Sequence, residues 1–202
     1  AQAEQNWGRG PVVLHDQSPL AQIHTRFVPD SPAVLEAGQT SFRSSFAWSN
    51  TLNRHHDGYW IDAETRELRL HAEHTPVERL QLGASLPLYW RGGGVLDSPI
   101  SSWHRFWGLP EGPRDDSGVE DNRYDISGEN EDDSSFNLPA DGLEAGDLRL
   151  AAKYLFSDGN EKLPALSLTG SLSVPTGAQL YGQNGVDASA GLLAAKRFSD
   201  WI

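Results

Sequence analysis

Seven histidines are the first residues in this chain to test for chemistry, because imidazole is both a common metal ligand and a general base. His55 and His56 are adjacent and are followed by Asp-Gly, which indicates a solvated turn in which neighbouring side chains point apart. His71 and His74 are three residues apart in an alternating stretch, so an extended backbone directs them to opposite faces. We therefore predict no metal site and no cofactor.

Carboxylates are concentrated between residues 109 and 146, where few apolar residues occur. Clustered carboxylates can bind calcium, but the regularly spaced Asp residues of a calcium-binding loop are absent. The composition favours a mobile acidic loop, with one short strand at 122–127. A second possibility is that these carboxylates bridge divalent cations to lipopolysaccharide, which would need no dedicated binding site.

Hydrolytic chemistry would need a serine, a histidine and a carboxylate that converge in space. The chain contains many serines and His104, but no G-x-S-x-G sequence of the kind that forms a nucleophile elbow. We therefore expect the protein not to be an enzyme, and an envelope hydrolase is kept as an alternative.

Charge and composition narrow the class of protein. The 202 residues include 28 acidic and 16 basic side chains, a formal net charge of −12, which disfavours a nucleic-acid partner. The absence of cysteine excludes disulfides and thiolate chemistry. No run of eighteen apolar residues is present, whereas a barrel strand needs only about 9–11 alternating residues to cross a membrane. The start Ala1–Glu4 resembles the remnant of a processed signal peptide.

Six stretches would have to position these side chains, and each alternates apolar with small or polar residues. From Leu80 to Leu88 every second residue is apolar, and Gln81, Gly83 and Ser85 lie between. This period of two predicts strands, and turn sequences such as Ser-Asp-Gly-Asn predict antiparallel hairpins between them. The six stretches are 40–53, 59–73, 80–89, 147–156, 166–174 and 186–196.

A helix is predicted inside the longest connection. Three consecutive glycines at 92–94 end the third strand, and Ser98 as N-cap, Pro99 at the first position and Gly108 after the end delimit the helix. Its aromatic stripe would lie at the membrane interface, plug a lumen or seal a small core. The interfacial or plug aromatics are Trp103, Phe106 and Trp107.

The polar positions of the strands carry serine, threonine, glycine and isolated charges, rather than the dense charge of a water-exposed face. This favours a membrane barrel with a wet lumen, and aromatics near strand ends would form its girdles. The lumen-lining candidates are Arg43, Gln81, Ser85, Arg149, Lys153 and Thr169. The girdle candidates are Trp48, Tyr59, Trp60, Tyr89, Trp90, Tyr154 and Phe156.

Two motifs resemble a known family. Asp16–Leu20 reads Asp-Gln-Ser-Pro-Leu, and Gly92–Arg114 combines the glycine break with V-L-D-S-x-I and W-H-R-F-W-G-L-P. Together they resemble the Gram-negative domain-of-unknown-function family numbered three-one-eight-seven, whose members are predicted outer-membrane β-barrels and tend to be longer than this chain. The resemblance runs from about residue 7 to the end. It implies a location and an architecture but no reaction.

The sequence thus predicts an all-β protein, an antiparallel up-and-down transmembrane β-barrel with a short amphipathic helix in a long loop. Residues 1–39 would form an irregular segment, a plug or a first strand, and 40–202 the barrel with its acidic loop 92–146. Six strands are fewer than the eight of the smallest outer-membrane barrels, so either 23–28 and 122–127 add two or the chain stops mid-barrel.

The predicted function is a porin-like passive pore or a structural component of the bacterial outer membrane, in contact with lipid or lipopolysaccharide and, for a pore, with a small solute. The short turns at 75–78 and 157–162 would lie on the periplasmic side. A soluble β-barrel that binds an apolar ligand is the second alternative, beside the envelope hydrolase.

Overall fold

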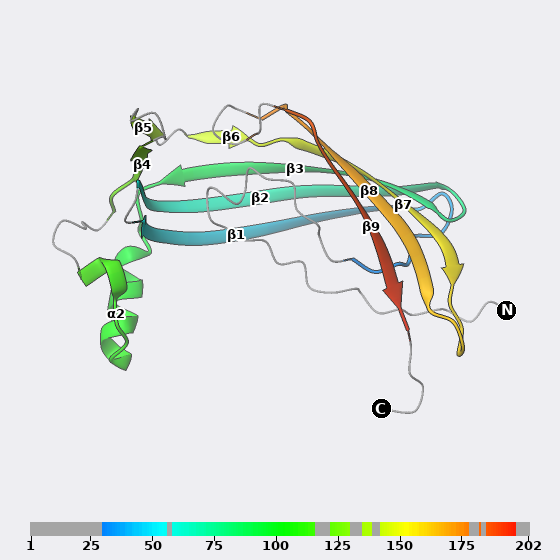
Figure 1. Ribbon diagram of the computed structural model, residues 1–202, viewed down its shortest axis with the longest axis horizontal. Coiled ribbons are helices and arrows are strands. Elements are labelled where there is room, and N and C mark those ends of the chain that lie inside the picture. Colours follow the sequence, from blue (N-terminus) through cyan, green and yellow to red (C-terminus); the bar gives the residue numbers. More distant parts are fainter. Residues whose placement is uncertain are drawn as a thin grey trace.

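The computed structural model describes residues 30–55, 58–115, 122–129, 135–138, 142–177, 182 and 185–196. Within these residues the chain forms one arched antiparallel sheet of nine strands, with a helix at one end (Figure 1). Each predicted stretch corresponds to one long strand, so the all-β antiparallel prediction is confirmed. The long strands are β1 (Thr40–His55), β2 (Tyr59–Val77), β3 (Leu80–Gly92), β7 (Leu148–Asp158), β8 (Ala165–Val174) and β9 (Asp187–Ala195).

The long strands lie side by side in chain order, and every neighbouring pair is antiparallel. Three short strands come from the segment predicted as an acidic loop. β4 (Asp125–Glu129) pairs with the start of β2, β5 (Ser135–Leu138) pairs with β4, and β6 (Leu143–Ala145) pairs with the end of β3. β2 extends beyond β3 and β3 extends beyond β7, and the short strands β4 and β6 satisfy the backbone groups left unpaired there.

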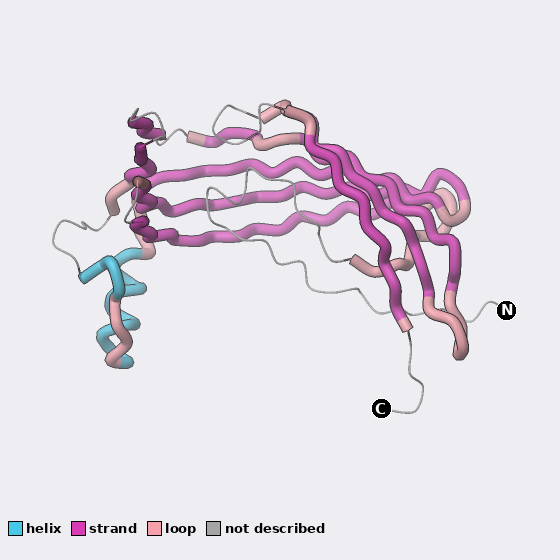
Figure 2. The backbone as a smooth tube through the Cα atoms, in the orientation of Figure 1, coloured by secondary structure: helices cyan, strands magenta, loops and turns pink. Residues whose placement is uncertain are grey.

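The β2–β3 and β7–β8 turns lie at one end of the sheet, and the short β1–β2 connection lies at the other end together with the two long connections (Figure 2). The turn between β2 and β3 consists of Glu78 and Arg79, and Arg79 has φ 70°. It lies later than the predicted turn at 75–78, because β2 continues to Val77 through an irregularity after His74. The β7–β8 turn, Gly159–Pro164, lies at the same end, close to its predicted place.

Closure of the barrel is where the prediction and the described residues differ. β1 and β9 are the outer long strands, and no described strand pairs with their outward edges. The described sheet is therefore open, which agrees with six long strands being too few to complete a circle. The additional strand predicted at 23–28 lies outside the described residues.

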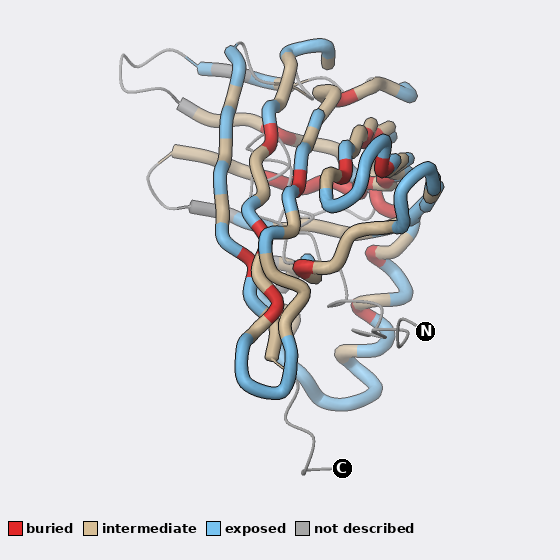
Figure 3. The backbone as a smooth tube through the Cα atoms, turned by 90° about the vertical axis from the view of Figure 1, so that its right-hand side faces the viewer, coloured by how far each residue is buried: buried red, intermediate tan, exposed pale blue. Residues whose placement is uncertain are grey.

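Burial along the strands is the reverse of that in a water-soluble sheet. On β8, Ser167 is 0% exposed whereas the next residue, Leu168, is 56% exposed. Figure 3 shows the same alternation along the neighbouring strands. We call the side with Ser167 and the other polar positions the polar face, and the side with Leu168 the apolar face. The described residues contain one small apolar cluster of buried Ile61, Ala63 and Ile126, where β4 meets β2.

Tyr89 corrects one prediction about the aromatic girdles. Its ring lies on the polar face, only 1% exposed, and its hydroxyl accepts a long hydrogen bond of 3.5 Å from Arg69 Nη2. The neighbouring Trp90 points to the apolar face and is exposed. Adjacent residues of a strand point to opposite sides, so only one of the two could belong to a girdle.

The helix α2 (Asp97–Trp107) begins earlier than predicted. Leu96 is its N-cap residue, so Ser98 and Pro99 lie inside the first turn. The predicted end is observed, since Gly108 has φ 64° and its N–H donates to the last turn of the helix. The start is shifted because a carboxylate on β2, that of Glu64, accepts the Leu96 N–H at 2.9 Å. Helix ends are in any case the least certain part of a sequence-based prediction.

The aromatic stripe of α2 faces away from the protein. Trp103, Phe106 and Trp107 are exposed, and Phe106 is 76% exposed, whereas Asp97 and Ser101 are the buried residues of the helix. The alternative in which these aromatics seal a small core is therefore not observed. No helix of the described residues is long and apolar enough to cross a membrane.

Candidate functional site

A hollow of about 270 Å³ lies on the polar face and is lined by residues of all six long strands. Gly83, Ala151 and Gly191 leave room there because they have small side chains or none. All of the residues predicted to line a lumen lie in the wall of this hollow: Arg43, Gln81, Ser85, Arg149, Lys153 and Thr169. The fold therefore brings together six residues from four strands.

Strand register explains why these residues meet. Arg43 is paired across the sheet with His71, His71 with Ser85, and Ser85 with Arg149, so four strands contribute to one row. A second row joins Gln81 of β3 to Lys153 of β7 and to Thr169 of β8. Partners directly opposite each other share a face of an antiparallel sheet.

Glu73 is the centre of a polar cluster in the hollow that the sequence analysis did not single out. Its carboxylate accepts from Arg43 Nη2 at 3.2 Å and from Gln81 Nε2 at 2.8 Å, and His71 Nε2 lies 3.3 Å away. Three strands are thereby connected by one carboxylate. Its position in the alternating pattern could have placed it on this face, but its partners come from β1 and β3 and are not local in sequence.

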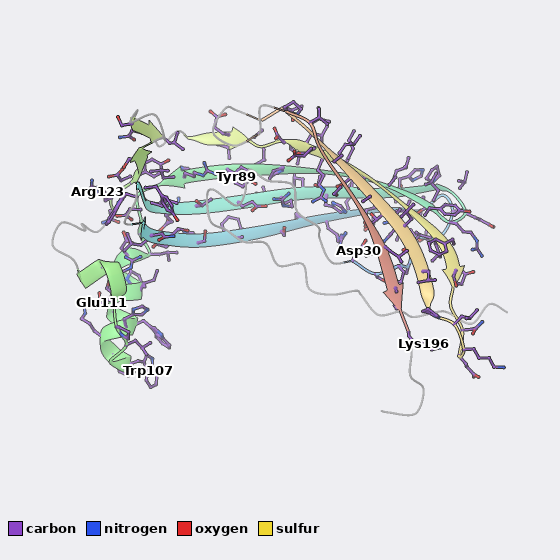
Figure 4. The ribbon with its side chains drawn as sticks, viewed as in Figure 1. Asp30, Tyr89, Trp107, Glu111, Arg123 and Lys196 are labelled. Carbon is purple, nitrogen blue, oxygen red and sulfur yellow. The ribbon has the colours of Figure 1, made fainter. Side chains whose placement is uncertain are left out.

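The described part of the predicted N-terminal segment, residues 30–39, lies on the same face. Lys153 Nζ makes an ion pair with Asp30 at 2.8 Å and donates to the Ser31 carbonyl at 3.1 Å. The Leu35 N–H donates to Gln81 Oε1 at 2.9 Å. Figure 4 shows Asp30 beneath the arch of the sheet. This segment therefore covers one end of the hollow, and residues 1–29 of the predicted plug lie outside the described residues.

Arg149 and Arg69 form the cationic wall of the hollow. Arg149 donates from Nε and Nη2 to Ser171 Oγ at 3.0 and 2.8 Å, and that hydroxyl is 2.7 Å from Ser189 Oγ. Arg69 donates from Nε to Glu67 at 2.6 Å. Both side chains line the same hollow, so their like charges repel one another.

A second polar cluster joins the helix to the sheet at the end with the long connections. Asp97 accepts from Asn50 at 2.8 Å, from Arg114 at 2.7 Å and from the Asn122 N–H at 2.9 Å. A Cβ on Gly94 would lie 2.5 Å from Asp97 Oδ2, so the glycine break allows this close packing. The sequence predicts the helix and a mobile loop after it, but no local pattern indicates the contacts that Asp97 makes with Asn50, Arg114 and Asn122.

Asp62 lies beside this cluster, where β2 pairs with β4. Burial raises the pKa of Asp62 to about 6, and the nearby Asp97 carboxylate acts in the same direction. This end of the sheet thus contains several carboxylates balanced by arginines such as Arg114. Among the described residues, no three His, Asp or Glu side chains are placed to hold one metal ion.

The histidines adopt the orientations expected from the strand. His71 points into the hollow, whereas His74 points to the opposite face and lies 2.9 Å from Thr40 Oγ1. Within the described residues His71 contacts Glu73, and no serine hydroxyl is hydrogen-bonded to it. His71, Glu73 and Ser85 line the same hollow, but no hydrogen bond joins the serine to the histidine in this part of the chain.

Comparison with known proteins gives one match. A family model described as a protein of unknown function, DUF3187, matches residues 1–201. No curated protein and no solved structure matches the chain. The family description assigns no activity.

Proposed function

The chain belongs to the DUF3187 family, as its two motifs predicted, and we propose that it is an outer-membrane β-barrel protein whose polar face lines a water-filled passage. One observation carries this proposal. The sheet places leucine, phenylalanine and tryptophan on its exposed side and charged and hydroxyl residues on its covered side. A membrane barrel has this arrangement, with lipid outside and water inside.

The height of the apolar face fits a bilayer. On β3 the apolar positions run from Leu80 to Trp90, which are ten residue steps apart. At about 3.3 Å per residue this is roughly 33 Å along the strand. A strand tilted by about 40° would then span about 25 Å, the height of the apolar band in outer-membrane barrels.

Aromatic side chains lie at the limits of this band. Trp48 and Trp90 are paired with Arg66 from either side, and the Arg66 guanidinium lies 5.0 and 5.1 Å from their ring centroids. Tyr154 and Phe156 are exposed near the opposite end. Such girdles mark the two membrane–water boundaries. Asp62 lies beyond Arg66 on β2 and is therefore outside the proposed membrane-spanning part.

Helix α2 fits the boundary at the end with the long connections. Its aromatic residues point away from the protein, and Figure 4 shows Trp107 on the part of the helix that is far from the sheet. None of the α2 residues lines the hollow. We therefore favour the interfacial role for Trp103, Phe106 and Trp107 over the role of a plug.

The topology supports an orientation. Outer-membrane barrels have short turns on the periplasmic side and long loops outside, so the Glu78–Arg79 turn would face the periplasm. β1 and β9 run in opposite directions, as the two edges of an antiparallel barrel must. In lipid the free edges of β1 and β9 need pairing partners, because an unpaired backbone N–H or C=O group there costs free energy. A closed barrel would therefore need strands beyond these six.

The polar hollow favours a passive pore for a small solute over a purely structural role, because a structural barrel needs no charged wall. A soluble barrel with an apolar ligand would need its leucines to face inward. Leu82, Leu168 and Leu172 face outward, and Leu193 is the one buried leucine of the described residues. For an envelope hydrolase the described residues contain no hydrogen-bonded serine and histidine near the hollow.

Cysteine labelling tests the proposal directly, because the chain has no native cysteine. Leu168→Cys and Thr169→Cys place single thiols on the apolar and polar faces of one strand. After reconstitution into phosphatidylcholine vesicles, a water-soluble maleimide should label Thr169→Cys and leave Leu168→Cys unmodified until the lipid is dissolved. Equal labelling of both thiols in lipid would overturn the proposal.

Solubility supplies an independent readout on the unmodified chain. An outer-membrane barrel should need detergent to remain monodisperse and should change its gel mobility on heating. A folded, monodisperse protein in detergent-free buffer would contradict the membrane assignment, whatever the labelling result.

A further inference from the structure

The charges that line the hollow are not balanced by one another. Four cationic side chains, Arg43, Arg69, Arg149 and Lys153, and two carboxylates, Asp30 and Glu73, lie in its wall. This basic interior occurs in a chain whose formal net charge is −12. The excess is therefore local, and it depends on how the strands are arranged.

The carboxylates near the hollow are committed to other cations. Glu73 binds Arg43, Asp30 binds Lys153, and Arg69 is held by Glu67 at 2.6 Å. Arg149 is the exception among the cationic side chains in this wall. It donates only to the neutral Ser171 hydroxyl, and no described carboxylate pairs with it.

A half-buried guanidinium that has only a hydroxyl acceptor is unfavourable, because burial removes water that would otherwise solvate the charge. The repulsion between Arg69 and Arg149 adds to this cost. An anion bound in the hollow that both guanidinium groups line would reduce both penalties. Planar guanidinium groups bind phosphate and carboxylate oxygens through paired N–H donors, a geometry that Lys153 cannot offer.

We propose that Arg149, together with Arg69, forms a binding site for a small oxyanion within the hollow, and that anionic solutes are what this passage favours. The solute assignment rests on the proposed pore function, whereas the binding site itself does not need a membrane. The hollow of about 270 Å³ suits a small ligand, since pockets for drug-sized molecules begin at roughly 300 Å³. Phosphate and short carboxylates share the required chemistry.

Inorganic phosphate is the probe for the first test. Isothermal titration of the folded chain in a nonionic detergent, or in plain buffer if the protein proves soluble, should give saturable binding that weakens as salt is added. Arg149→Gln should bind phosphate about tenfold more weakly or not at all. Arg149→Lys should be intermediate, because it keeps the charge and loses the planar fork.

Arg79→Gln is the matched control. Arg79 lies on the short turn, is exposed and already pairs with Asp158 at 2.6 Å, so its loss should leave phosphate binding unchanged. Absence of saturable binding to the unmodified chain, or equal affinity in Arg149→Gln, would overturn the inference. Because the titration does not depend on insertion into lipid, such a result would leave the membrane proposal standing.

Arginine modification gives a second readout that needs no variant. Phosphate should slow the reaction of phenylglyoxal with Arg149, as followed by peptide mass spectrometry, and should not affect Arg79. Replacing phosphate with succinate compares the two oxyanion classes, and the one that protects at lower concentration is the preferred ligand. Unchanged reactivity of Arg149 with both anions would also overturn the inference.

Discussion

The two faces of the sheet differ in what stabilises them. The polar face is held by hydrogen bonds and ion pairs within the protein, such as those that Glu73 makes with Arg43 and Gln81. The apolar face consists of leucines and aromatics that no other described element covers, and Phe46 is 64% exposed. In a water-soluble sheet the opposite would hold, because burial of apolar area is the main favourable term in folding.

The exposed apolar face shows which contribution to folding free energy the described residues lack, namely the burial of apolar side chains. The one apolar cluster of the described residues, around Ile61 and Ile126, is small for a sheet of this size. Apolar area contributes free energy only when it leaves water, at roughly 25 cal/mol per Å². The apolar face therefore requires an apolar surrounding, and lipid is the one that we propose.

The largest expected effect comes from placing a charge on the apolar face. Leu172→Arg should destabilise the protein in phosphatidylcholine vesicles by about 2–4 kcal/mol, as for cations near the middle of the bilayer. Ser173→Arg, the next residue on the polar face, should cost much less because it reaches the watery side. Urea titration of vesicle-refolded protein measures both, and equal losses would remove the distinction between the faces.

Removal of the central carboxylate tests the polar face. Glu73→Ala should destabilise the protein by about 1.5–3 kcal/mol, because hydrogen bonds between charged groups contribute this much and Arg43 would lose its partner. Glu78→Ala, on the exposed turn, is the control and should change stability by less than about 0.5 kcal/mol. The same urea titration applies. If both variants were equally stable, the cluster would not hold the strands together.

Two serines of β8 on the polar face differ in whether their hydroxyl is hydrogen-bonded, and comparing them measures what that hydrogen bond contributes. Ser171→Ala should cost about 1 kcal/mol, because the Ser171 hydroxyl accepts from Arg149 and contacts Ser189. Ser167→Ala should be nearly neutral, since the Ser167 hydroxyl is also buried but has no hydrogen-bond partner among the described residues. A loss at Ser167 as large as that at Ser171 would show that burial alone determines the effect.

The smallest effect concerns the boundary of the apolar face. Trp90→Ala should cost about 0.5–1 kcal/mol through loss of the contact between its ring and Arg66. Trp90→Phe retains an aromatic ring and should recover part of the loss. Comparison of the two variants by urea titration in vesicles measures this, and identical stabilities would argue against a girdle at this position.

Much of the fold could be predicted because the alternation of residues is a local signal. Leu80, Leu82 and Leu88 lie on one side of their extended strand whatever the rest of the protein does. For the same reason Arg149 and Lys153 share one side of their own strand. The six strands and the candidate lining residues depend only on this period. The end of the helix at Gly108 was also a local signal, since glycine readily adopts a positive φ.

Other features could not be predicted because their signals are short or distant. β5 has four residues and β6 has three, too few to show a period. The Asp97 cluster joins residues as far apart as Asn50 and Asn122, and no local pattern relates them. Tyr89 lies near the end of its strand, as a girdle residue would, but its place in the alternation directs its ring to the polar face.

The sequence by itself determined which residues share a face and that one face is apolar, because backbone geometry in a strand has a period of two. Only the tertiary structure decided which strands are neighbours and at which register. It therefore decided that Arg149 lines the same hollow as Arg69 and donates to Ser171. Those choices depend on hydrogen bonds and packing between segments far apart in the chain. The same alternation would be compatible with other registers, and each would bring a different set of charges together.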